Sequence, residues 1–362
     1  MIEKIGYILV CFFIVYLALQ GLFGYLEDNF GITITTGEEI FISQNEGQDW
    51  ETLKSPVKQG ISAKTLVFDP ENPYHLYLAS AKGIFQSKNQ GKKFRSQRTV
   101  FNTQTKPSVV SECIFDPQRP NTIYIVCKQI GGDKLLVSND GGENFRTIFV
   151  SEKEDRITAF AIDPFSSQFL YIGTKKGLFL ESKDFGSSWR KKIQFSQEIS
   201  QIAPDPYKEG EIYVVLAPVE KNPFDYWSFR IPGKLMITKN RGEDFREFEK
   251  IKEFDIKKVV FDPNIKGQVY FVSDSYLLRT SPGEKIEIVK DLSSSDAKIT
   301  AFTIDPKNSN ILYLGTENVI YRSENKGEDW EVIEPPIKGR VQEIKINPSD
   351  PKVILLSIRK TL

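Results

Sequence analysis

Aromatic rings and an arginine gather in one short segment of the sequence, residues 217–234. These side chains are Phe224, Tyr226, Trp227, Phe229 and Arg230. Tryptophan, tyrosine and arginine are the residues that most often carry the energy of a protein–protein contact. The same rings could instead fold back over their own strands as a local plug. The segment therefore predicts either a partner-binding surface or a plug.

Charged residues elsewhere could extend a binding site or perform hydrolysis. Arg156, Lys298 and Arg340 lie at or just before predicted strands and are further candidates for partner contact. Cleavage of a glycosidic bond would need two carboxylates several ångströms apart. The acidic candidates are Glu152, Glu154, Asp155, Glu198, Asp225 and Asp255. Because no two of them form a defined pair and solvated surface charge explains them as well, we assign no catalytic residue.

Composition excludes several classes of function. Lys plus Arg and Asp plus Glu both number 48 in 362 residues, so no basic excess attracts nucleic acid. A single histidine, His75, nearly excludes His-based triads and multi-histidine metal sites, and Cys11, Cys113 and Cys127 lack ligand spacing. Cys113 and Cys127 could form a disulfide in an exported domain, although cysteine's preference for cores favours two free thiols. We expect no metal, no cofactor and no nucleic-acid partner.

The amino-terminal part differs in composition from the rest. Residues 5–26 carry no charge and, as a helix, would span about 33 Å, enough to cross a bilayer. We expect an uncleaved transmembrane anchor, with a cleaved signal peptide as the alternative. Lys4 precedes the span, and Glu27 and Asp28 follow it. This charge pattern predicts that residues 1–4 are cytoplasmic, that 27–36 form a linker and that the large domain is extracytoplasmic.

A polar octapeptide returns six times, for example as SQNEGQDW from Ser43 and SENKGEDW from Ser323. The frame is Ser/Thr, any residue, Asp/Asn, any residue, Gly, any two residues, Trp/Phe. The framework residues are Ser43, Asn45, Gly47, Trp50, Ser87, Asn89, Gly91, Phe94, Ser138, Asp140, Gly142, Phe145, Ser182, Asp184, Gly186, Trp189, Thr238, Asn240, Gly242, Phe245, Ser323, Asn325, Gly327 and Trp330. In a weaker seventh copy, RTSPGEKI, Gly283 and Ile286 keep the glycine and aromatic places, while Arg279 and Ser281 replace the polar residues.

The octapeptide is typical of a turn rather than of a reactive site. An Asx side chain can accept backbone N–H groups just downstream, and the glycine supplies a left-handed backbone angle. Four of the six copies carry Asn at the third position, and Asn is neither a general acid nor a strong cation ligand. We therefore interpret the six copies as structural turns.

A second marker recurs in phase with the octapeptide, a hydrophobic run that ends in Asp-Pro or Asn-Pro. Its polar residues are Asp69, Asp116, Asp163, Asp205, Asp262, Asp305 and Asn347. Short strand-like runs such as LYLAS and LYIGT follow. Each period predicts a four-stranded antiparallel meander, and seven of them predict an all-β, seven-bladed β-propeller over residues 37–362. Since Pro348–Arg359 supplies too few strands for the last blade, we expect Glu38–Trp50 to complete it and close the ring.

The octapeptide frame resembles the Asp-box of bacterial neuraminidase repeats, over residues 37–362. That box also occurs in sortilin-type receptors, in xyloglucan-degrading glycosidases and in the photosystem II assembly factor. The resemblance implies a propeller but no single function, because those proteins include hydrolases, sorting receptors and assembly factors. The xyloglucan-degrading members pair two propellers in a longer chain, from which this chain departs.

Phe229–Pro232 spells FRIP, which resembles the arginine-bearing motif of sialidases. In that family the arginine belongs to a carboxylate-binding triad, so the resemblance would group Arg230 with Arg156 and Arg340. The position departs from the family pattern, because sialidases carry the motif before the first box of a six-bladed ring. No tyrosine–carboxylate nucleophile pair can be assigned here.

Meander geometry places the Asp-Pro turns and the octapeptides on one face of the disc. The opposite face carries the more variable loops, where binding tends to lie. Our leading hypothesis is a membrane-anchored, non-enzymatic propeller that binds a protein partner in assembly or sorting. The alternative is a carbohydrate-binding or glycoside-hydrolysing propeller. A pocket with two facing carboxylates would favour the alternative, and a shallow aromatic surface would favour the first hypothesis.

Overall fold

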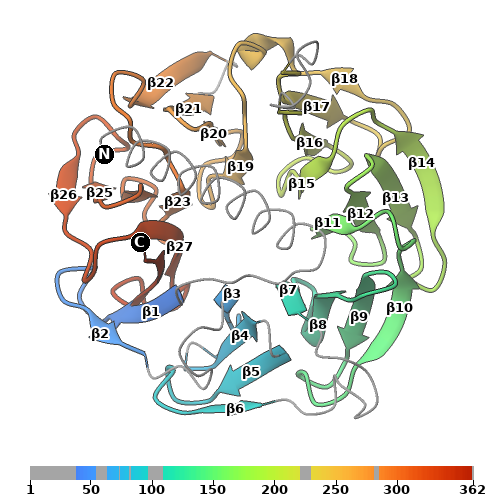
Figure 1. Ribbon diagram of the computed structural model, residues 1–362, viewed down its shortest axis with the longest axis horizontal. Coiled ribbons are helices and arrows are strands. Elements are labelled where there is room, and N and C mark those ends of the chain that lie inside the picture. Colours follow the sequence, from blue (N-terminus) through green and yellow to red (C-terminus); the bar gives the residue numbers. More distant parts are fainter. Residues whose placement is uncertain are drawn as a thin grey trace, which may run out of the picture.

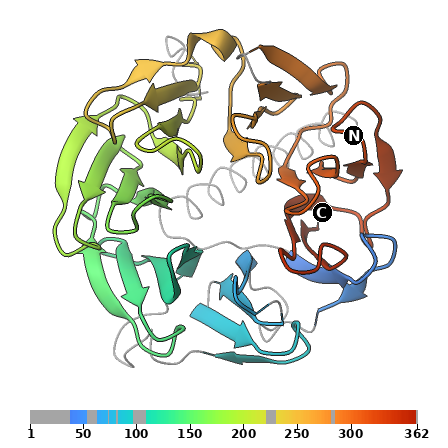
Figure 2. The same cartoon turned by 180° about the vertical axis from the view of Figure 1, so that it is seen from behind.

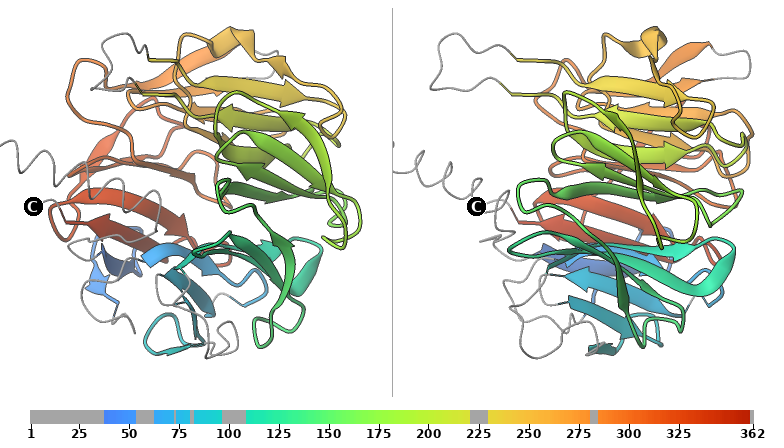
Figure 3. Two further views of the ribbon diagram at one scale, coloured as in Figure 1. Left: turned by 45° about the vertical axis from the view of Figure 1, so that its right-hand side comes forward. Right: turned by 90° about the vertical axis from the view of Figure 1, so that its right-hand side faces the viewer.

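Seven four-stranded antiparallel sheets form a ring about a central axis in the computed structural model (Figures 1 and 2). The structure describes residues 38–53, 63–72, 74–80, 83–96, 109–220, 230–280 and 285–360. The strands run between the two faces of the disc, so successive turns fall on alternate faces (Figure 3). The predicted seven-bladed all-β propeller is confirmed.

The blades are numbered along the chain from β3. Blade 1 contains β3 (Ala63–Phe68), β4 (Leu76–Ser80), β5 (Gly83–Ser87) and β6 (Phe94–Ser96), and blade 2 contains β7 (Val109–Asp116), β8 (Arg119–Lys128), β9 (Lys134–Ser138) and β10 (Arg146–Val150). Blade 3 contains β11 (Ile157–Ile162), β12 (Leu170–Thr174), β13 (Leu178–Ser182) and β14 (Arg190–Gln194), and blade 4 contains β15 (Ile199–Pro204), β16 (Ile212–Leu216), β17 (Lys234–Thr238) and β18 (Arg246–Glu247). Blade 5 contains β19 (Lys258–Phe261), β20 (Val269–Val272), β21 (Tyr276–Thr280) and β22 (Ile286–Asp291), and blade 6 contains β23 (Ala301–Ile304), β24 (Leu312–Gly315), β25 (Ile320–Ser323) and β26 (Glu331–Ile333). Blade 7 contains β27 (Arg340–Ile346), β28 (Ile354–Arg359), β1 (Glu38–Ser43) and β2 (Glu51–Thr52), and a single 3-10 turn, η2 (Glu249–Ile251), follows β18.

Blade 7 closes the ring with strands from both ends of the described chain. Its order is β2-β1-β28-β27, and β1 pairs with β28 from Glu38↔Arg359 to Ser43↔Ile354. Ile40, Phe41 and Ile42 of β1 are all buried. The predicted closure is confirmed, because strands from both ends of the described chain complete one four-stranded blade.

The core lies in the layers between neighbouring blades. The second strand of a blade is covered on both sides, so β4, β12 and β16 are buried at every position. This double burial explains the continuous apolar runs LYLAS, LYIGT and IYVVL, whereas the outer strands β10, β14 and β22 are exposed or half-buried. Cys113 and Cys127 are buried free thiols in this core, as the sequence favoured.

The structure shifts the alignment of the weaker seventh octapeptide by one residue. In blades 1 to 4 and 6 the Ser/Thr follows the residue that pairs with the second-strand tyrosine, as in Tyr77↔Gln86 before Ser87. In blade 5 the tyrosine pairs with Arg279, so Thr280 rather than Arg279 takes the first place. Thr280 pairs with Ile286, whereas Ser87 pairs with Phe94, so the turn is one residue shorter. The short turn was missed because we aligned it on its glycine.

Residues 1–37 lie outside the described residues. The predicted cytoplasmic end (1–4), anchor (5–26) and linker (27–36) therefore remain predictions. Within the described part of the chain, no helix has the length and apolar character needed to cross a membrane.

Candidate functional site

The six octapeptides share one pattern of hydrogen bonds. At Ser43, the hydroxyl donates to Asn45 Oδ1 (2.9 Å) and accepts from the Gly47 N–H (2.8 Å). Asn45 Oδ1 also accepts from the Asp49 N–H (2.9 Å). The other five copies repeat all three bonds. The polar framework residues thus satisfy the turn's own backbone, as predicted.

The fourth position of the octapeptide matters in a way the sequence did not reveal. Its backbone is left-handed in all six copies, with φ from 53° to 69°, although only one copy has glycine there. The N–H of this residue donates to a carbonyl in the Asp-Pro or Asn-Pro turn of its own blade, as from Glu46 to Lys352 (2.9 Å). This bond holds the two turns of each blade together on one face and offsets the strain of a non-glycine residue at positive φ.

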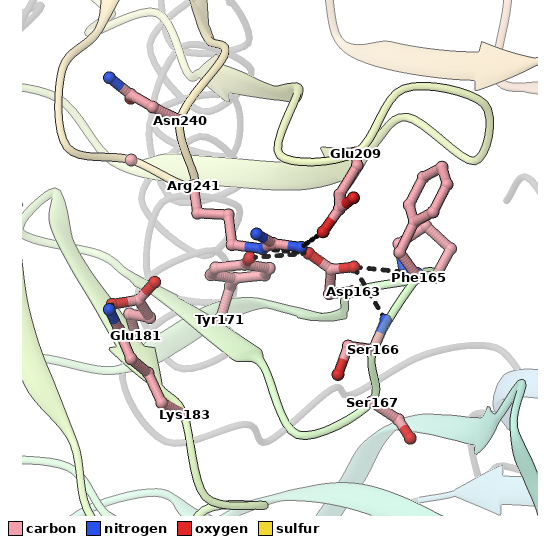
Figure 4. A network of polar contacts seen from close by, with 12 residues as sticks. Asp163, Phe165, Ser166, Ser167, Tyr171, Glu181, Lys183, Glu209, Asn240 and Arg241 are labelled. Carbon is pink, nitrogen blue, oxygen red and sulfur yellow. Dashed lines mark hydrogen bonds and ion pairs between the residues drawn. The ribbon is translucent and has the colours of Figure 1, made fainter.

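The fourth residue also joins neighbouring blades. Arg241, from the octapeptide of blade 4, reaches Asp163 of blade 3 (Nε to Oδ2, 3.1 Å), and Tyr171 donates to the same oxygen (Figure 4). The Arg241 guanidinium also lies 4.4 Å from the centre of the Phe169 ring. In blade 7, Glu46 takes a comparable place and pairs with Arg322 of blade 6 (2.8 Å). The octapeptide face is therefore occupied by scaffold contacts.

Substitutions at Asp184 and Gly186 test this structural role. Asp184→Asn should leave the free energy of unfolding at pH 7 nearly unchanged, because Asn keeps the Oδ1 acceptor. Gly186→Val should cost about 1–3 kcal/mol, since φ is +84° and a Cβ would lie 2.5 Å from Ile148 Cδ1. Chemical denaturation of both variants measures these changes. A large loss of calcium affinity in Asp184→Asn would contradict the structural interpretation.

The same aspartate predicts a change in acid sensitivity. Hydrogen bonds from the Ser188 side chain and backbone, and from Ser182, lower the pKa of Asp184. A carboxyl with a lowered pKa stabilises the fold above its unfolded-state pKa and loses that contribution as the pH falls through its folded-state pKa. The melting temperature of Asp184→Asn should therefore fall less than that of the wild type on acidification below pH 4.

On the opposite face, the described residues fix both ends of the insertion between β16 and β17. Val219 and Ile231 form an antiparallel bridge, with N–H to O distances of 2.9 and 3.0 Å. The buried Gln197 amide donates to the carbonyls of Ala217 and Pro232, each at 2.9 Å. Phe224, Asp225, Tyr226, Trp227 and Phe229 lie outside the described residues, so the choice between a binding surface and a plug stays open.

Arg230 at the end of the insertion is held by two carboxylates. It forms an ion pair with Asp255, in the link to blade 5, and lies 3.5 Å from Glu220. Asp255 also accepts the Gly233 N–H (2.9 Å). The hydrogen bond that Arg230 donates to Asp255 raises the pKa of Arg230 above its ordinary value. Arg230 therefore fastens the base of the insertion to the disc.

Arg156 is likewise engaged, in a group that we call the Asp133 cluster (Lys128, Asp133 and Arg156). Asp133 is fully buried and accepts from Arg156 Nε (2.8 Å), Lys128 Nζ (3.1 Å) and the Ile157 N–H (3.0 Å). The cluster ties the loop between β8 and β9 to the link between blades 2 and 3. Arg156 is thus engaged within the fold, and its role in partner contact remains a prediction.

The remaining predicted cations and carboxylates are spread over this face. Lys298 is exposed and lies 3.8 Å from Asp274, and Arg340 is exposed. Asp155 is buried and caps a neighbouring turn, accepting from Thr174 (2.9 Å) and from the Lys176 N–H (2.8 Å). Glu152 and Glu154 are exposed, and Glu198 is half-buried. Among the described residues the structure thus brings no two of these carboxylates together in a pocket, and no group of three His, Cys, Asp or Glu side chains could hold a metal.

Other hollows occur in the described part of the chain, and two of them are well defined. A crevice of about 660 Å³ separates blades 4 and 5, beside the shortened turn, and is lined by Tyr213, Phe248, Lys239 and Arg246 among others. The second, of about 450 Å³, lies in the central channel against the inner strands of blades 4 to 7, and Glu343 is its single carboxylate. Neither hollow was foreseen, because both depend on how blades meet.

These features match solved propellers in fold. Against a xyloglucanase of glycoside hydrolase family GH74 from Xanthomonas campestris, the TM-score is 0.66 at 14% identity, over 82% of this chain and 50% of that one. The GH74 enzyme from Niastella koreensis gives 0.65 at 15% identity, over 82% and 51%. The chain thus spans about half the length of these enzymes. It is a β-propeller.

A second group of similar structures matches the propeller over nearly its whole length. YCF48 from Cyanidioschyzon merolae gives a TM-score of 0.59 at 14% identity, over 86% of this chain and 98% of that one. YCF48 bound to a D1 peptide gives 0.58 at 12% identity, over 82% and 92%. No protein-family model and no curated protein matches the sequence of this propeller. At such identities the likeness extends to the fold alone.

Proposed function

We propose that this propeller is a non-enzymatic, membrane-anchored protein that binds a protein partner on the face opposite the octapeptides. The observation that carries the proposal is the fixed base of the insertion. The bridge between Val219 and Ile231, the Gln197 amide and the Arg230–Asp255 pair hold both ends of a nine-residue segment rich in aromatic rings. A segment whose ends are already ordered loses less conformational entropy on binding.

The charges of this face support binding over hydrolysis. A glycosidase needs one carboxyl as acid and a second as base or nucleophile, facing a common cavity. Asp255 is bonded to Arg230, Asp155 caps a turn, and Glu343 in the channel accepts the Leu66 N–H (3.1 Å). These described carboxylates are used by the fold, so the glycan-directed alternative has less support.

The same proposal covers location and partner class. The uncharged run of residues 5–26 would hold the propeller at the outer side of a membrane, where a partner in assembly or sorting would meet it. One similar fold, YCF48, is known with a D1 peptide bound to it, which shows that a propeller of this size can bind a protein segment. We infer a protein partner rather than a particular one.

A double variant tests the proposal. In Trp227→Ala with Arg230→Ala, we expect the melting temperature to change by only a few degrees, because Arg230 and Asp255 are both partly exposed and such pairs contribute about 1 kcal/mol or less. Partner recovery after mild crosslinking in native membranes should fall more than tenfold, since hot-spot truncations cost about 2 kcal/mol or more each.

The matched control is Tyr74→Ala, which removes an exposed aromatic ring from the octapeptide face. It should leave partner recovery unchanged. If the double variant instead loses stability while recovery falls only in proportion, the segment is a plug. If neither quantity changes, binding does not use this segment and the proposal fails.

A further inference from the structure

The hollow in the central channel is walled by the inner strands β15, β19, β23 and β27, whose inward edges are not paired with another strand (Figure 1). Its volume is about 450 Å³. An equivalent position recurs on each inner strand, four residues before the Asp or Asn of the following turn. The seven residues at this position are Thr65, Glu112, Ala159, Gln201, Lys258, Ala301 and Glu343.

At two blade junctions this residue binds the backbone of the next inner strand. Gln201 Oε1 accepts the Val259 N–H (2.7 Å), and Glu343 Oε2 accepts the Leu66 N–H (3.1 Å). The inward N–H of an inner strand can thus donate a hydrogen bond to a carboxamide or a carboxylate oxygen. Glu343 is an example within the fold of a carboxylate that accepts such a hydrogen bond.

At the next junction the position holds an amine instead of an acceptor. Lys258 lines the hollow together with Phe302 of blade 6, and Phe302 pairs with Leu314 in the same register in which Val259 pairs with Phe271. The Phe302 N–H therefore points inward as the Val259 N–H does. Within the described part of the chain, no side chain accepts a hydrogen bond from it. Lys258 and Phe302 both line the hollow, so this junction offers two donor groups and, among the described residues, no side-chain acceptor for the Phe302 N–H.

The charges around the hollow are also unbalanced. Lys345 lies 3.3 Å from Glu343, which already accepts the Leu66 N–H. Lys258 forms no ion pair with any described residue, and Gln342 Nε2 is buried without an acceptor. A buried donor without an acceptor, such as the Gln342 amide, is costly unless water or an anion satisfies it, whereas the Lys258 side chain is exposed.

We propose that the central channel binds an anionic group, a carboxylate or a phosphate, between Lys258, Lys345 and the Phe302 amide. An oxygen of the anion would accept the Phe302 N–H at the junction of blades 5 and 6, as Glu343 Oε2 accepts the Leu66 N–H at the junction of blades 7 and 1. This inference is independent of partner binding by the insertion, because it involves other blades and other residues.

The protonation of Lys258 agrees with this assignment. Although the Lys258 side chain is exposed, the surrounding protein reduces its hydration and, together with the charge of Lys345, lowers the pKa of Lys258 to about 8, against an opposing effect of Glu343. A bound anion would favour the charged amine and take up a proton near that pH. Glu112 occupies the equivalent position on β7, where burial raises its pKa to about 7, so it is mostly ionised above pH 8.

Titration calorimetry of the full-length chain in a chloride-free zwitterionic buffer tests the proposal, with inorganic phosphate and sodium acetate as separate probes. We expect saturable binding of at least one probe at pH 7.5. Binding of both points to carboxylates and phosphates alike, and binding of phosphate alone restricts the site to phosphate. Lys258→Met should weaken binding at least tenfold. Lys257→Met removes the same charge from the adjacent residue, which pairs with Asp274, and should change affinity less than twofold.

The pH dependence gives a second readout. Wild-type affinity should fall between pH 7.5 and 9.5 as Lys258 loses its proton, and this dependence should be weaker in Lys258→Met. The proposal is overturned if neither probe binds, or if the two methionine variants lose affinity equally, which would indicate general surface charge.

Discussion

Replacing Asp133 with alanine should lower the free energy of unfolding by about 3–5 kcal/mol, the largest effect that we expect from a polar substitution in this protein. Asp133 is fully buried, whereas the side chains of Lys128 and Arg156 are 21% and 15% exposed. Alanine would leave two largely desolvated cations and the Ile157 N–H without their acceptor. Urea denaturation followed by tryptophan fluorescence measures the change.

Asp274→Ala is the matched control for Asp133→Ala. Asp274 lies on the same face and also has two lysine neighbours, Lys257 and Lys298, but its side chain is 34% exposed. Exposed ion pairs contribute about 1 kcal/mol or less, so this variant should remain close to the wild type. Equal losses in the two variants would show that burial does not determine how much the Asp133 cluster contributes to the free energy of unfolding.

A single methyl group at Gly177 should cost about 3 kcal/mol or more. Gly177 turns the chain between β12 and β13 with φ of +85°, and an added Cβ would lie 2.4 Å from the carbonyl oxygens of both Gln197 and Phe195. These carbonyl oxygens belong to the backbone, so they cannot relieve the clash by a change of rotamer as the end of a side chain could. We expect Gly177→Ala to lower the melting temperature by several degrees in scanning calorimetry.

Gly141→Ala separates backbone angle from crowding. Gly141 has φ of +69° with nothing within 4 Å of its added Cβ. The five other octapeptides hold non-glycine residues at this angle, so alanine should cost about 1 kcal/mol. A loss at Gly177 no larger than that at Gly141 would contradict the clash with the two carbonyls.

The fold could be predicted from the sequence because its turns are specified locally. An Asx side chain, a left-handed glycine and a nearby aromatic act within eight residues, and the chain repeats them in phase with the Asp-Pro marker. The same local rule failed at residues 279–286, where a one-residue deletion shifts the first place to Thr280. The sequence pattern also did not predict the left-handed backbone at the fourth position of the octapeptide, because residues such as Glu46 and Arg241 do not indicate a positive φ as glycine does.

The candidate sites were less predictable because they depend on pairings across blades. Arg156 looks like a surface cation until the fold brings it to Asp133, 23 residues away along the chain. Arg230 was correctly placed on the face opposite the octapeptides, but its partner Asp255 was considered only as a separate carboxylate. The Lys258 site follows from an inner-strand register that only becomes visible once all seven blades are aligned.

The closure of blade 7 has a consequence for the order of events during synthesis. β1 leaves the ribosome early, but its partner β28 follows more than 300 residues later. At about 5–20 residues per second, β1 waits for roughly 15–60 s before it can pair. During that interval Ile40, Phe41 and Ile42, buried in the finished ring, have no sheet to cover them. We therefore expect nascent chains that stop before β28 to depend most strongly on chaperones, and the β1–β28 contact to be the last one formed.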